Sequence, residues 1–307
     1  MLSRVIRVGC RRSRLAINQT ESVVETLRSI SPGLRFEIVP IATEGDEDFK
    51  EGRPKKGKDA FVKAIEVRLL EGEIDFAVHS MKDMPAKLPK GLIIAAVPPR
   101  EDPRDVLISR QGKRLSELPE GARVGTSSIR RKVQLLSIRP DLHIVEIRGN
   151  VDTRIRKLSE LNLDAIVLAF AGLKRLGLAD LVSEFLPVQS VLPAPGQGAL
   201  AVEAMEDDAN ILQVLERIDH RETRICVEAE RAFMARIGGG CDIPVAAYAR
   251  IEDGRLLLDG MVSLPDSWEI IRLVECGEVS EAAAIGYRLA ERIVTLKAQV
   301  ASKGWEH

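Results

Sequence analysis

Short runs rich in valine and isoleucine alternate with amphipathic stretches over residues 1–200. This alternation is typical of a parallel sheet whose strands are joined by crossover helices, so we predict an α/β fold. The predicted strands are Val5–Gly9, Glu37–Ala42, Phe76–His79, Leu92–Val97, Val106–Ser109, Arg123–Gly125, His143–Ile147 and Ala165–Phe170. The predicted helices are Ser13–Ile30, Ala60–Glu71, Ser128–Ile138, Thr153–Leu161 and Ala171–Leu176.

The last ninety residues or so have a different pattern, which predicts a small α+β domain with a three-stranded antiparallel sheet. The Asp253-Gly254 pair between the first two strands is a strong hairpin signal. Helices are predicted at Arg224–Ile237 and Val279–Ala301, and the strands at Val245–Ile251, Leu256–Val262 and Glu269–Glu275.

The chain of 307 residues is long for one hydrophobic core, so we expect several domains. Proline-rich segments at 98–103 and 192–198 indicate two crossings between domains. Two crossings insert the second domain into the first, with a hinged cleft between the two lobes. The predicted domains are 1–98 with 200–218, then 99–199, and finally 219–307.

The composition is that of an ordinary globular protein, with 45% hydrophobic and 30% charged residues and a net charge of −1. A broad basic face for nucleic acid is therefore not expected, and two Trp and two Tyr offer few stacking platforms. No run of about eighteen apolar residues predicts a membrane span. The scattered cysteines and the absence of a recognisable secretory signal predict a cytoplasmic protein with free thiols. The scattered histidines suggest no metal site.

Three predicted strands each lead into a helix opening crowded with arginine, at residues 5–14, 124–131 and 144–154. Ser, Thr or Asp stands at the N-cap position in each. Cations there oppose the helix dipole at a cost of roughly 0.3 to 1 kcal/mol each. We therefore predict that these openings bind anions, through free N–H groups and guanidinium forks. The alternative is that the arginines extend into solvent.

A polar stretch at 43–58 has no apolar period, which is typical of a lid or a disordered loop. Asp46-Glu47-Asp48 within it is compatible with a metal site, but a solvated run of charges is the simpler interpretation.

Cys241 follows three glycines, which expose its sulfur and let the loop approach other groups. An accessible thiol is a nucleophile suited to forming a thioether. The alternative is a helix stop followed by a small buried residue. The other three cysteines, Cys10, Cys226 and Cys276, lie in strand or helix patterns and are predicted to pack in cores.

Lys82 and Asp83 follow the predicted strand Phe76–His79, where doubly wound sheets place their ligands. Arginines nearby would keep Asp83 ionised, so that it stabilises a developing cation or accepts a pyrrole-type N–H. A surface ion pair is the alternative. His79 is a candidate base, although a histidine satisfied at a strand end is the simpler account. Together these residues suit a substrate with several carboxylates that passes through a cationic intermediate.

Over nearly its whole length the chain contains short motifs in a fixed order and spacing. They are Arg11-x-Ser13, Ala77-Val78-His79-Ser80-Met81-Lys82-Asp83, Arg100-Glu101-Asp102-Pro103-Arg104-Asp105, Val124-Gly125-Thr126-Ser127-Ser128-x-Arg130-Arg131, Arg148-Gly149-Asn150-Val151-x-Thr153-Arg154, Leu168-Ala169-x-Ala171-Gly172-Leu173-Lys174-Arg175-Leu176-Gly177, Pro195-Gly196-Gln197-Gly198 and Gly239-Gly240-Cys241. Through these motifs the chain resembles the porphobilinogen deaminase (hydroxymethylbilane synthase) family, and their order and spacing make the resemblance specific.

The resemblance implies three domains, the first two built like the lobes of periplasmic binding proteins around a cleft. It implies a transferase that joins four porphobilinogen molecules head to tail, with loss of ammonia, into hydroxymethylbilane. A dipyrromethane cofactor, linked to Cys241 through a thioether, is the implied primer.

The resemblance also implies the roles of site residues. Asp83 is the implied catalytic residue, which holds pyrrole N–H groups and stabilises the cationic state. Carboxylates of substrate and cofactor are implied to bind Arg11, Ser13, Lys58, Lys82, Thr126, Ser128, Arg130, Arg131, Arg148, Arg154 and Arg175.

The resemblance leaves rival interpretations to weigh. A non-catalytic, two-lobed anion-binding protein would explain the arginines, but not the glycine-flanked Cys241. A nucleic-acid module is a weaker rival. We expect a monomer whose partner is the small-molecule substrate, with no metal, nucleic acid or membrane partner.

Overall fold

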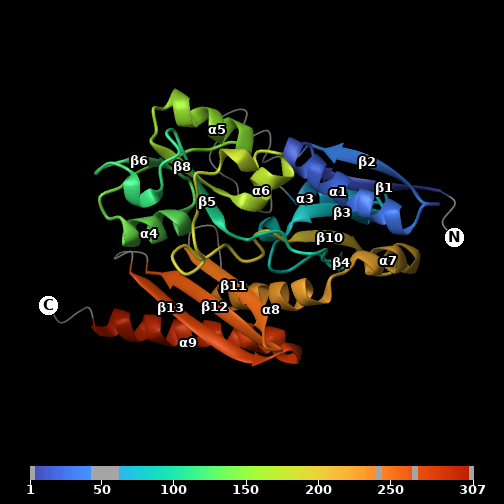
Figure 1. The fold of residues 1–307 in the computed structure, drawn as a ribbon. Coiled ribbons are helices and arrows are strands. Elements are labelled where there is room, and N and C mark those ends of the chain that lie inside the picture. The colour runs from blue at the N-terminus through green and yellow to red at the C-terminus, as the bar shows by residue number, and fades with distance from the viewer. Residues whose placement is uncertain (1–3, 43–61, 239–243, 265–268, 304–307) are drawn as a thin grey trace. The chain divides into compact units, whose positions relative to one another are not determined.

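The computed structural model describes residues 4–42, 62–238, 244–264 and 269–303, and Figure 1 shows the ribbon. The chain forms two compact units, which are treated separately below. The first contains residues 1–102, 174–177 and 198–224, and the second contains 103–173, 178–197 and 225–307. The division into three domains made from the sequence stays a prediction.

The first unit is built on a five-stranded sheet with the order β2-β1-β3-β10-β4. Strand β1 pairs in parallel with β2 and β3, whereas β10 runs antiparallel to β3 and β4. A segment from late in the chain therefore occupies an interior position of this sheet. The strands are β1 (Val5–Arg11), β2 (Arg35–Ile41), β3 (Phe76–Ser80), β4 (Leu92–Ala96) and β10 (Leu200–Met205).

Helices cover both faces of the first sheet, as in doubly wound folds. On one face Ile6, Val78 and Val202 form a core with Leu27 of α1 and Ile211 of α7. On the other face, Ala77 packs with Ile65 and Leu69 of α3. The helical segments of the first unit are α1 (Arg14–Ile30), α3 (Lys63–Leu70), the 3-10 turn η2 (Met81–Asp83), α7 (Ala209–Leu215) and η5 (Glu216–Ile218).

The second unit contains a sheet of the same pattern, with the order β7-β6-β8-β5-β9. Strand β6 pairs in parallel with β7 and β8, whereas β5 runs antiparallel to β8. Its strands are β5 (Asp105–Ser109), β6 (Arg123–Gly125), β7 (His143–Val145), β8 (Ala165–Ala169) and β9 (Glu184–Phe185). Helix α4 packs on one face of this sheet through Leu135, and α5 packs on the other through Leu158.

The helical segments that accompany this sheet are η3 (Leu115–Glu117), α4 (Ile129–Ile138), α5 (Val151–Glu160), α6 (Phe170–Arg175) and η4 (Ala179–Leu181). The boundary between the two units falls within α6.

The C-terminal part forms an antiparallel sheet of three strands, covered by two helices. Phe233, Leu258 and Leu289 are fully buried in its core. Gly286 of the last helix lets that helix approach the helix that contains Ala229, because a Cβ atom at position 286 would lie 2.4 Å from the Ala229 carbonyl oxygen. The elements are α8 (Arg221–Ile237), β11 (Val245–Glu252), β12 (Arg255–Ser263), β13 (Ile270–Glu278), η6 (Val279–Glu281) and α9 (Ala282–Lys303).

The predicted α/β class is confirmed, with two mixed sheets that helices cover on both faces and a small antiparallel C-terminal sheet. The hairpin at Asp253-Gly254 is also confirmed, since both residues adopt positive φ angles of 49° and 75°. Strand β10 and helix α7 were not among the predicted elements. The β10 run, Leu-Ala-Val-Glu-Ala-Met, is poor in strand-forming residues, and its pairing partners lie far away in the sequence.

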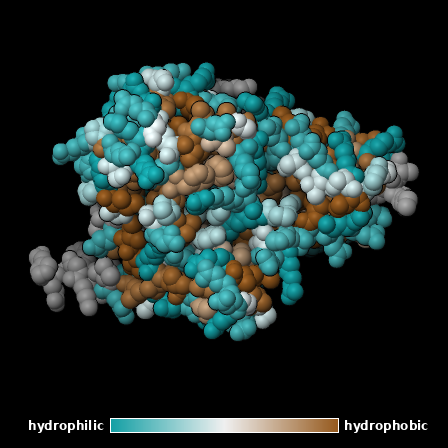
Figure 2. Space-filling model, viewed as in Figure 1, coloured by the Kyte–Doolittle hydropathy of each residue, from teal (hydrophilic) through white to brown (hydrophobic). Residues whose placement is uncertain are grey.

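The packing predictions for the cysteines are partly confirmed. Cys10 and Cys226 are buried, but the prediction for Cys276 was wrong, because this thiol is exposed on β13. On the face shown in Figure 2, hydrophilic residues are interspersed with hydrophobic ones. Among the helices of the described ranges, none is long and apolar enough to cross a membrane.

Candidate functional site

The opening of α4 is organised by two hydroxyl side chains, as the N-cap pattern predicts. The Ser128 side chain accepts the Arg131 backbone N–H at 3.4 Å. The Ser128 N–H in turn donates to Thr126 Oγ1 at 3.2 Å, and the Thr126 N–H pairs with the Val145 carbonyl at 2.9 Å. The turn between β6 and α4 is therefore fixed by its own hydrogen bonds.

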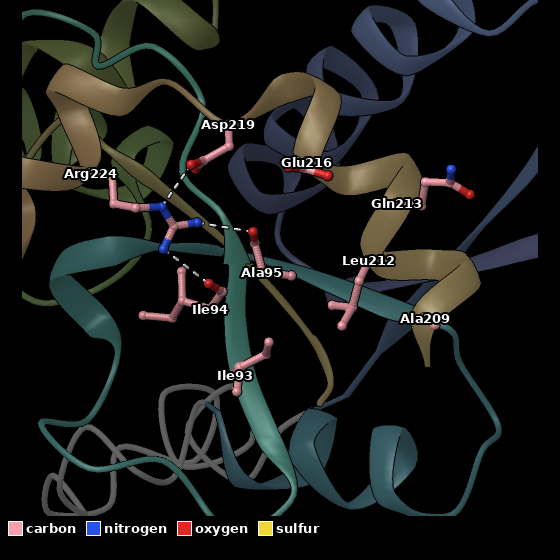
Figure 3. Close-up of a pocket in the computed structure, with 9 residues that line it drawn as sticks. All are labelled: Ile93, Ile94, Ala95, Ala209, Leu212, Gln213, Glu216, Asp219 and Arg224. Atoms are coloured by element: carbon pink, nitrogen blue, oxygen red, sulfur yellow. Dashed lines mark hydrogen bonds and ion pairs between the residues drawn. The ribbon is translucent and has the colours of Figure 1, made fainter. Parts of the chain in front are cut away.

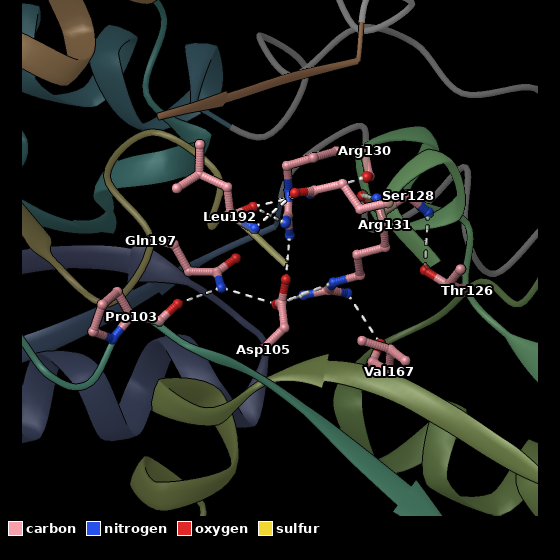
Figure 4. A network of polar contacts seen from close by, with 10 residues as sticks. Pro103, Asp105, Thr126, Ser128, Arg130, Arg131, Val167, Leu192 and Gln197 are labelled. Atoms are coloured by element: carbon pink, nitrogen blue, oxygen red, sulfur yellow. Dashed lines mark hydrogen bonds and ion pairs between the residues drawn. The ribbon is translucent and has the colours of Figure 1, made fainter. Parts of the chain in front are cut away.

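Arg130 and Arg131 lie side by side at this opening and share the fully buried Asp105 of β5 (Figure 4). Arg130 Nη2 donates to Asp105 Oδ2 at 2.7 Å. Arg131 donates to Oδ1 through Nη2 at 2.7 Å and Nε at 3.1 Å, and Gln197 Nε2 donates to the same oxygen at 2.9 Å. Burial alone would raise the pKa of Asp105, but the two guanidinium groups lower it far below its usual range.

Carbonyl groups fix the far sides of both guanidinium groups. Arg130 Nη1 donates to the Leu192 carbonyl at 2.6 Å, and Arg131 Nη1 donates to the Val167 carbonyl at 3.1 Å. A guanidinium has five N–H donors, and within the described residues these bonds use two of Arg130 and three of Arg131. The three charged groups together carry one net positive charge. This cluster therefore suits a single carboxylate better than a more highly charged anion.

The opening of α5 places two further predicted arginines. Gly149 adopts φ +119°, and a Cβ atom there would lie 2.7 Å from a Thr153 side-chain carbon, so the turn requires glycine. Arg154 Nε donates to the Gly149 carbonyl at 2.7 Å. Arg148 is exposed and pairs with Glu146 at 2.7 Å. Arg154 is thus held against the turn, whereas Arg148 extends from the surface.

In the first unit, predicted site residues lie at the ends of β1 and β3. Arg11 ends β1, and Ser13 caps α1 by accepting the Ala16 N–H at 3.3 Å. Lys82 and Asp83 are half-buried in η2, directly after β3. Because β1 and β3 are neighbouring parallel strands, their carboxyl ends share one edge of the sheet.

The backbone and the neighbouring side chains anchor η2. Met81 and Met84 on either side of Lys82 and Asp83 are buried, and the Met81 N–H donates to the Ala199 carbonyl at 3.0 Å. Gln19 Nε2 on α1 donates to Ser80 Oγ at 3.0 Å. The Asp83 carboxylate is therefore carried on a firmly held turn.

Arg175 is also tied to the first unit, where its Nη2 donates to the Gly198 carbonyl at 2.8 Å. Asn18 on α1 donates to the Arg175 carbonyl at 3.0 Å, which places α1 beside this residue. Burial lowers the pKa of Arg175, and Glu101 opposes the shift. An arginine remains protonated in either case.

The structure thus groups the predicted residues into three sets. Thr126, Ser128, Arg130 and Arg131 belong to one network, and Arg148 and Arg154 lie at the next helix opening. Arg11, Ser13, Lys82, Asp83 and Arg175 belong to the first unit. Lys58 and Cys241, with the acidic run 46–48, lie outside the described residues.

Asp105 and Gln197 stand in quoted motifs, but the sequence reasoning gave them no role. An aspartate that opens an apolar strand was the available signal, because such a buried carboxylate needs cationic partners. His79 is buried with its Nε2 atom 3.1 Å from Glu203 Oε2 of β10. Neither of these two atoms has a hydrogen-bond partner among the described residues.

A surface pocket of the first unit lies apart from the predicted site residues (Figure 3). Arg224 in its wall donates to Asp219 Oδ2 at 2.7 Å, and to the Ile94 and Ala95 carbonyls at 3.2 and 2.9 Å. These bonds join the start of α8 to β4, so Arg224 serves the fold there. Ile93, Leu212 and Gln213 also line this pocket.

Comparisons with known proteins agree over nearly the whole chain. Residues 6–213 match the family model described as porphobilinogen deaminase, dipyromethane cofactor binding domain, and residues 224–295 match porphobilinogen deaminase, C-terminal domain. A porphobilinogen deaminase of Pelotomaculum thermopropionicum is 51% identical over 97% of this chain and 96% of its own length. One from Brevibacillus brevis is 49% identical over 94% of this chain and 93% of its own.

Among solved structures, a TRAP periplasmic solute binding protein from Desulfovibrio salexigens is similar with a TM-score of 0.44 at 12% identity. That match covers 71% of this chain and 73% of the other.

Proposed function

The chain belongs to the porphobilinogen deaminase family, and from this premise we propose how its own residues serve the reaction. It is a transferase of tetrapyrrole synthesis that joins four porphobilinogen molecules into hydroxymethylbilane and releases ammonia from each. The observation that carries this conclusion is the match of both family models, which together span residues 6–213 and 224–295.

The family carries a dipyrromethane cofactor, and the donor set of the described residues fits such a group. A dipyrromethane made from porphobilinogen bears acetate and propionate side chains. Within the described residues, the hydrogen bonds of Arg130 and Arg131 leave further N–H donors available, and the hydroxyl groups of Thr126 and Ser128 belong to the same network. Carboxylates require donors of this kind. When bound, the group supplies the free pyrrole carbon from which the product chain grows. We assign its attachment to Cys241.

The arginines bind the carboxylates of the growing product, which becomes more anionic at each addition. Arg130 and Arg131 are fixed before any ligand binds, so their orientation costs little on binding. Arg148 and Arg154 add further cations at the next helix opening. Arg11, Ser13, Lys82 and Arg175 serve the same purpose in the first unit, and we assign Lys58 to it as well.

Asp83 acts on the pyrrole nitrogens. Its carboxylate accepts pyrrole N–H bonds and stabilises the positive charge that develops as the aminomethyl nitrogen leaves. The buried flanks of η2 hold this carboxylate in place, so little reorganisation is needed during the reaction.

We also propose the setting in which the enzyme works. We assign three domains, at 1–98 with 200–218, at 99–199 and at 219–307. The protein works as a monomer in the cytoplasm and has no nucleic-acid partner.

The test of this function is a turnover assay with porphobilinogen. We expect one ammonia released for each porphobilinogen consumed, together with formation of the linear bilane. A non-catalytic anion-binding protein would bind porphobilinogen and release no ammonia, and that result would overturn the proposal.

A further inference from the structure

Glu230 of α8 is a fully buried carboxylate that the preceding account does not use. Its Oε2 atom accepts the Gly196 backbone N–H at 2.6 Å, and its Oε1 atom accepts the Ala249 N–H of β11 at 2.8 Å. All three residues belong to the second unit. One side chain therefore joins a helix, a strand and the turn at 192–197.

The segment Leu192–Gln197, called the brace below, contacts the arginine cluster at both of its ends. At one end, the Leu192 carbonyl accepts Arg130 Nη1 at 2.6 Å. At the other end, Gln197 Nε2 donates to Asp105 Oδ1 at 2.9 Å and to the Pro103 carbonyl at 2.6 Å. The brace thus contacts Arg130 directly, and it contacts Asp105, which pairs with both Arg130 and Arg131.

Glu230 holds the brace at Gly196, directly before Gln197. Gly196 adopts φ +72°, a conformation that other residues rarely adopt, and its N–H points to the carboxylate. The Ala247 N–H donates to the Pro193 carbonyl at 3.1 Å, so β11 supports the same segment. A hydrogen bond to a charged acceptor is roughly twice as strong as a neutral one, so Glu230 contributes the stronger support.

We infer that Glu230 is a positioning residue for the arginine pair, acting through Gly196, Gln197 and Asp105. The inference rests on the proposed role of Arg130 and Arg131 in binding carboxylates. Its consequence is that Glu230 sets the affinity for the anionic substrate, while the chemical step depends on Asp83 in the other unit.

The test compares Glu230→Gln with Asp75→Asn in the full-length enzyme. Asp75 is also a buried carboxylate that accepts a backbone N–H, from Arg7 at 2.6 Å, but it precedes β3 and so lies at the opposite end of that strand from Asp83. We expect Glu230→Gln to raise KM for porphobilinogen about tenfold with kcat within about twofold, and Asp75→Asn to lower Tm without raising KM. An unchanged KM in folded Glu230→Gln would overturn the inference.

A double-mutant cycle tests the route through the brace. We expect Gln197→Leu by itself to raise KM. In that background Glu230→Gln should add little, whereas equal effects of Glu230→Gln in both backgrounds would refute the route. If Glu230→Gln does not fold, Gln197→Leu alone decides: the inference requires a raised KM with a preserved kcat. Ammonia release by the wild type is measured in parallel, so that failure of the proposed function is recognised separately.

Discussion

Arg131 directs two N–H groups at a single oxygen of Asp105, with Nη2 at 2.7 Å and Nε at 3.1 Å. The second oxygen of Asp105 accepts Arg130, so one buried carboxylate orients two neighbouring guanidinium groups. Two like charges on consecutive residues would otherwise repel each other in a poorly solvated site. Asp105 therefore makes the arginine pair possible, and it leaves one positive charge for an incoming carboxylate.

Asp105→Asn is expected to destabilise the fold strongly. The change leaves two buried cations without a counter-charge, which costs about 3–5 kcal/mol of the free energy of unfolding. Urea unfolding at neutral pH measures the loss. Glu252→Gln is the control, because it breaks an exposed ion pair with Arg250 and should cost less than about 1 kcal/mol. Equal losses of unfolding free energy in the two variants would show that the Asp105 cluster stabilises the fold no more than an exposed ion pair does.

The stability of the protein should fall in acid, in part through Asp105. The pKa of Asp105 in the folded state lies below its usual value of 3.8, because the two guanidinium groups outweigh burial. Its contribution is therefore complete above about pH 4 and is lost as the pH falls toward the folded-state pKa. Urea unfolding of wild type and Asp105→Asn between pH 7 and pH 3 should show a smaller pH slope for the variant. Parallel slopes would contradict this assignment.

The two kinds of arginine at the helix openings should respond differently to lysine substitution. Arg131→Lys loses the forked contact with Asp105 and should lower the free energy of unfolding by about 2 kcal/mol. Arg148→Lys should leave stability within about 0.5 kcal/mol, because Arg148 is exposed and pairs with an exposed Glu146. Thermal and urea unfolding of both variants measure these losses. A loss in Arg148→Lys as large as that in Arg131→Lys would contradict the prediction.

Asp83→Ala should keep the fold and lose nearly all turnover. The side chain is half-buried on a turn that Met81 and Met84 anchor, so removal costs little packing. Loss of its charge from the reacting centre should reduce kcat by about a hundredfold or more. Lys82→Met is the neighbouring control and should have a much smaller effect, because many cations share the binding of carboxylates. Near-normal turnover in folded Asp83→Ala would remove the residue from its role.

The local signals in the sequence were sufficient for the helix openings but not for their partners. Ser13 and Ser128 cap their helices as predicted, because an N-cap depends on residues within one turn. The pairing of Arg131 with Asp105 spans 26 positions, and the brace joins Gln197 to Asp105 across 92. Such contacts depend on how strands are ordered in the sheet, which no short motif encodes. Strand β10 was missed for the same reason, because its place between β3 and β4 compensates for a weak local preference.

The four cysteines allow the central claim, that a polyacid is tethered to one sulfur and held by arginines, to be tested directly. Cys10 and Cys226 are buried, and burial raises the pKa of the Cys10 thiol, so neither is suited to attack. Cys276 is exposed and provides the matched control for Cys241.

Intact-protein mass spectrometry of the wild type, Cys241→Ser and Cys276→Ser is therefore the decisive measurement. We predict a wild-type mass above that of the sequence by two linked pyrrole units, retained in Cys276→Ser and absent from Cys241→Ser. A wild-type protein at plain sequence mass that stays inert after preincubation with porphobilinogen, or an addition that persists in Cys241→Ser, would contradict the account.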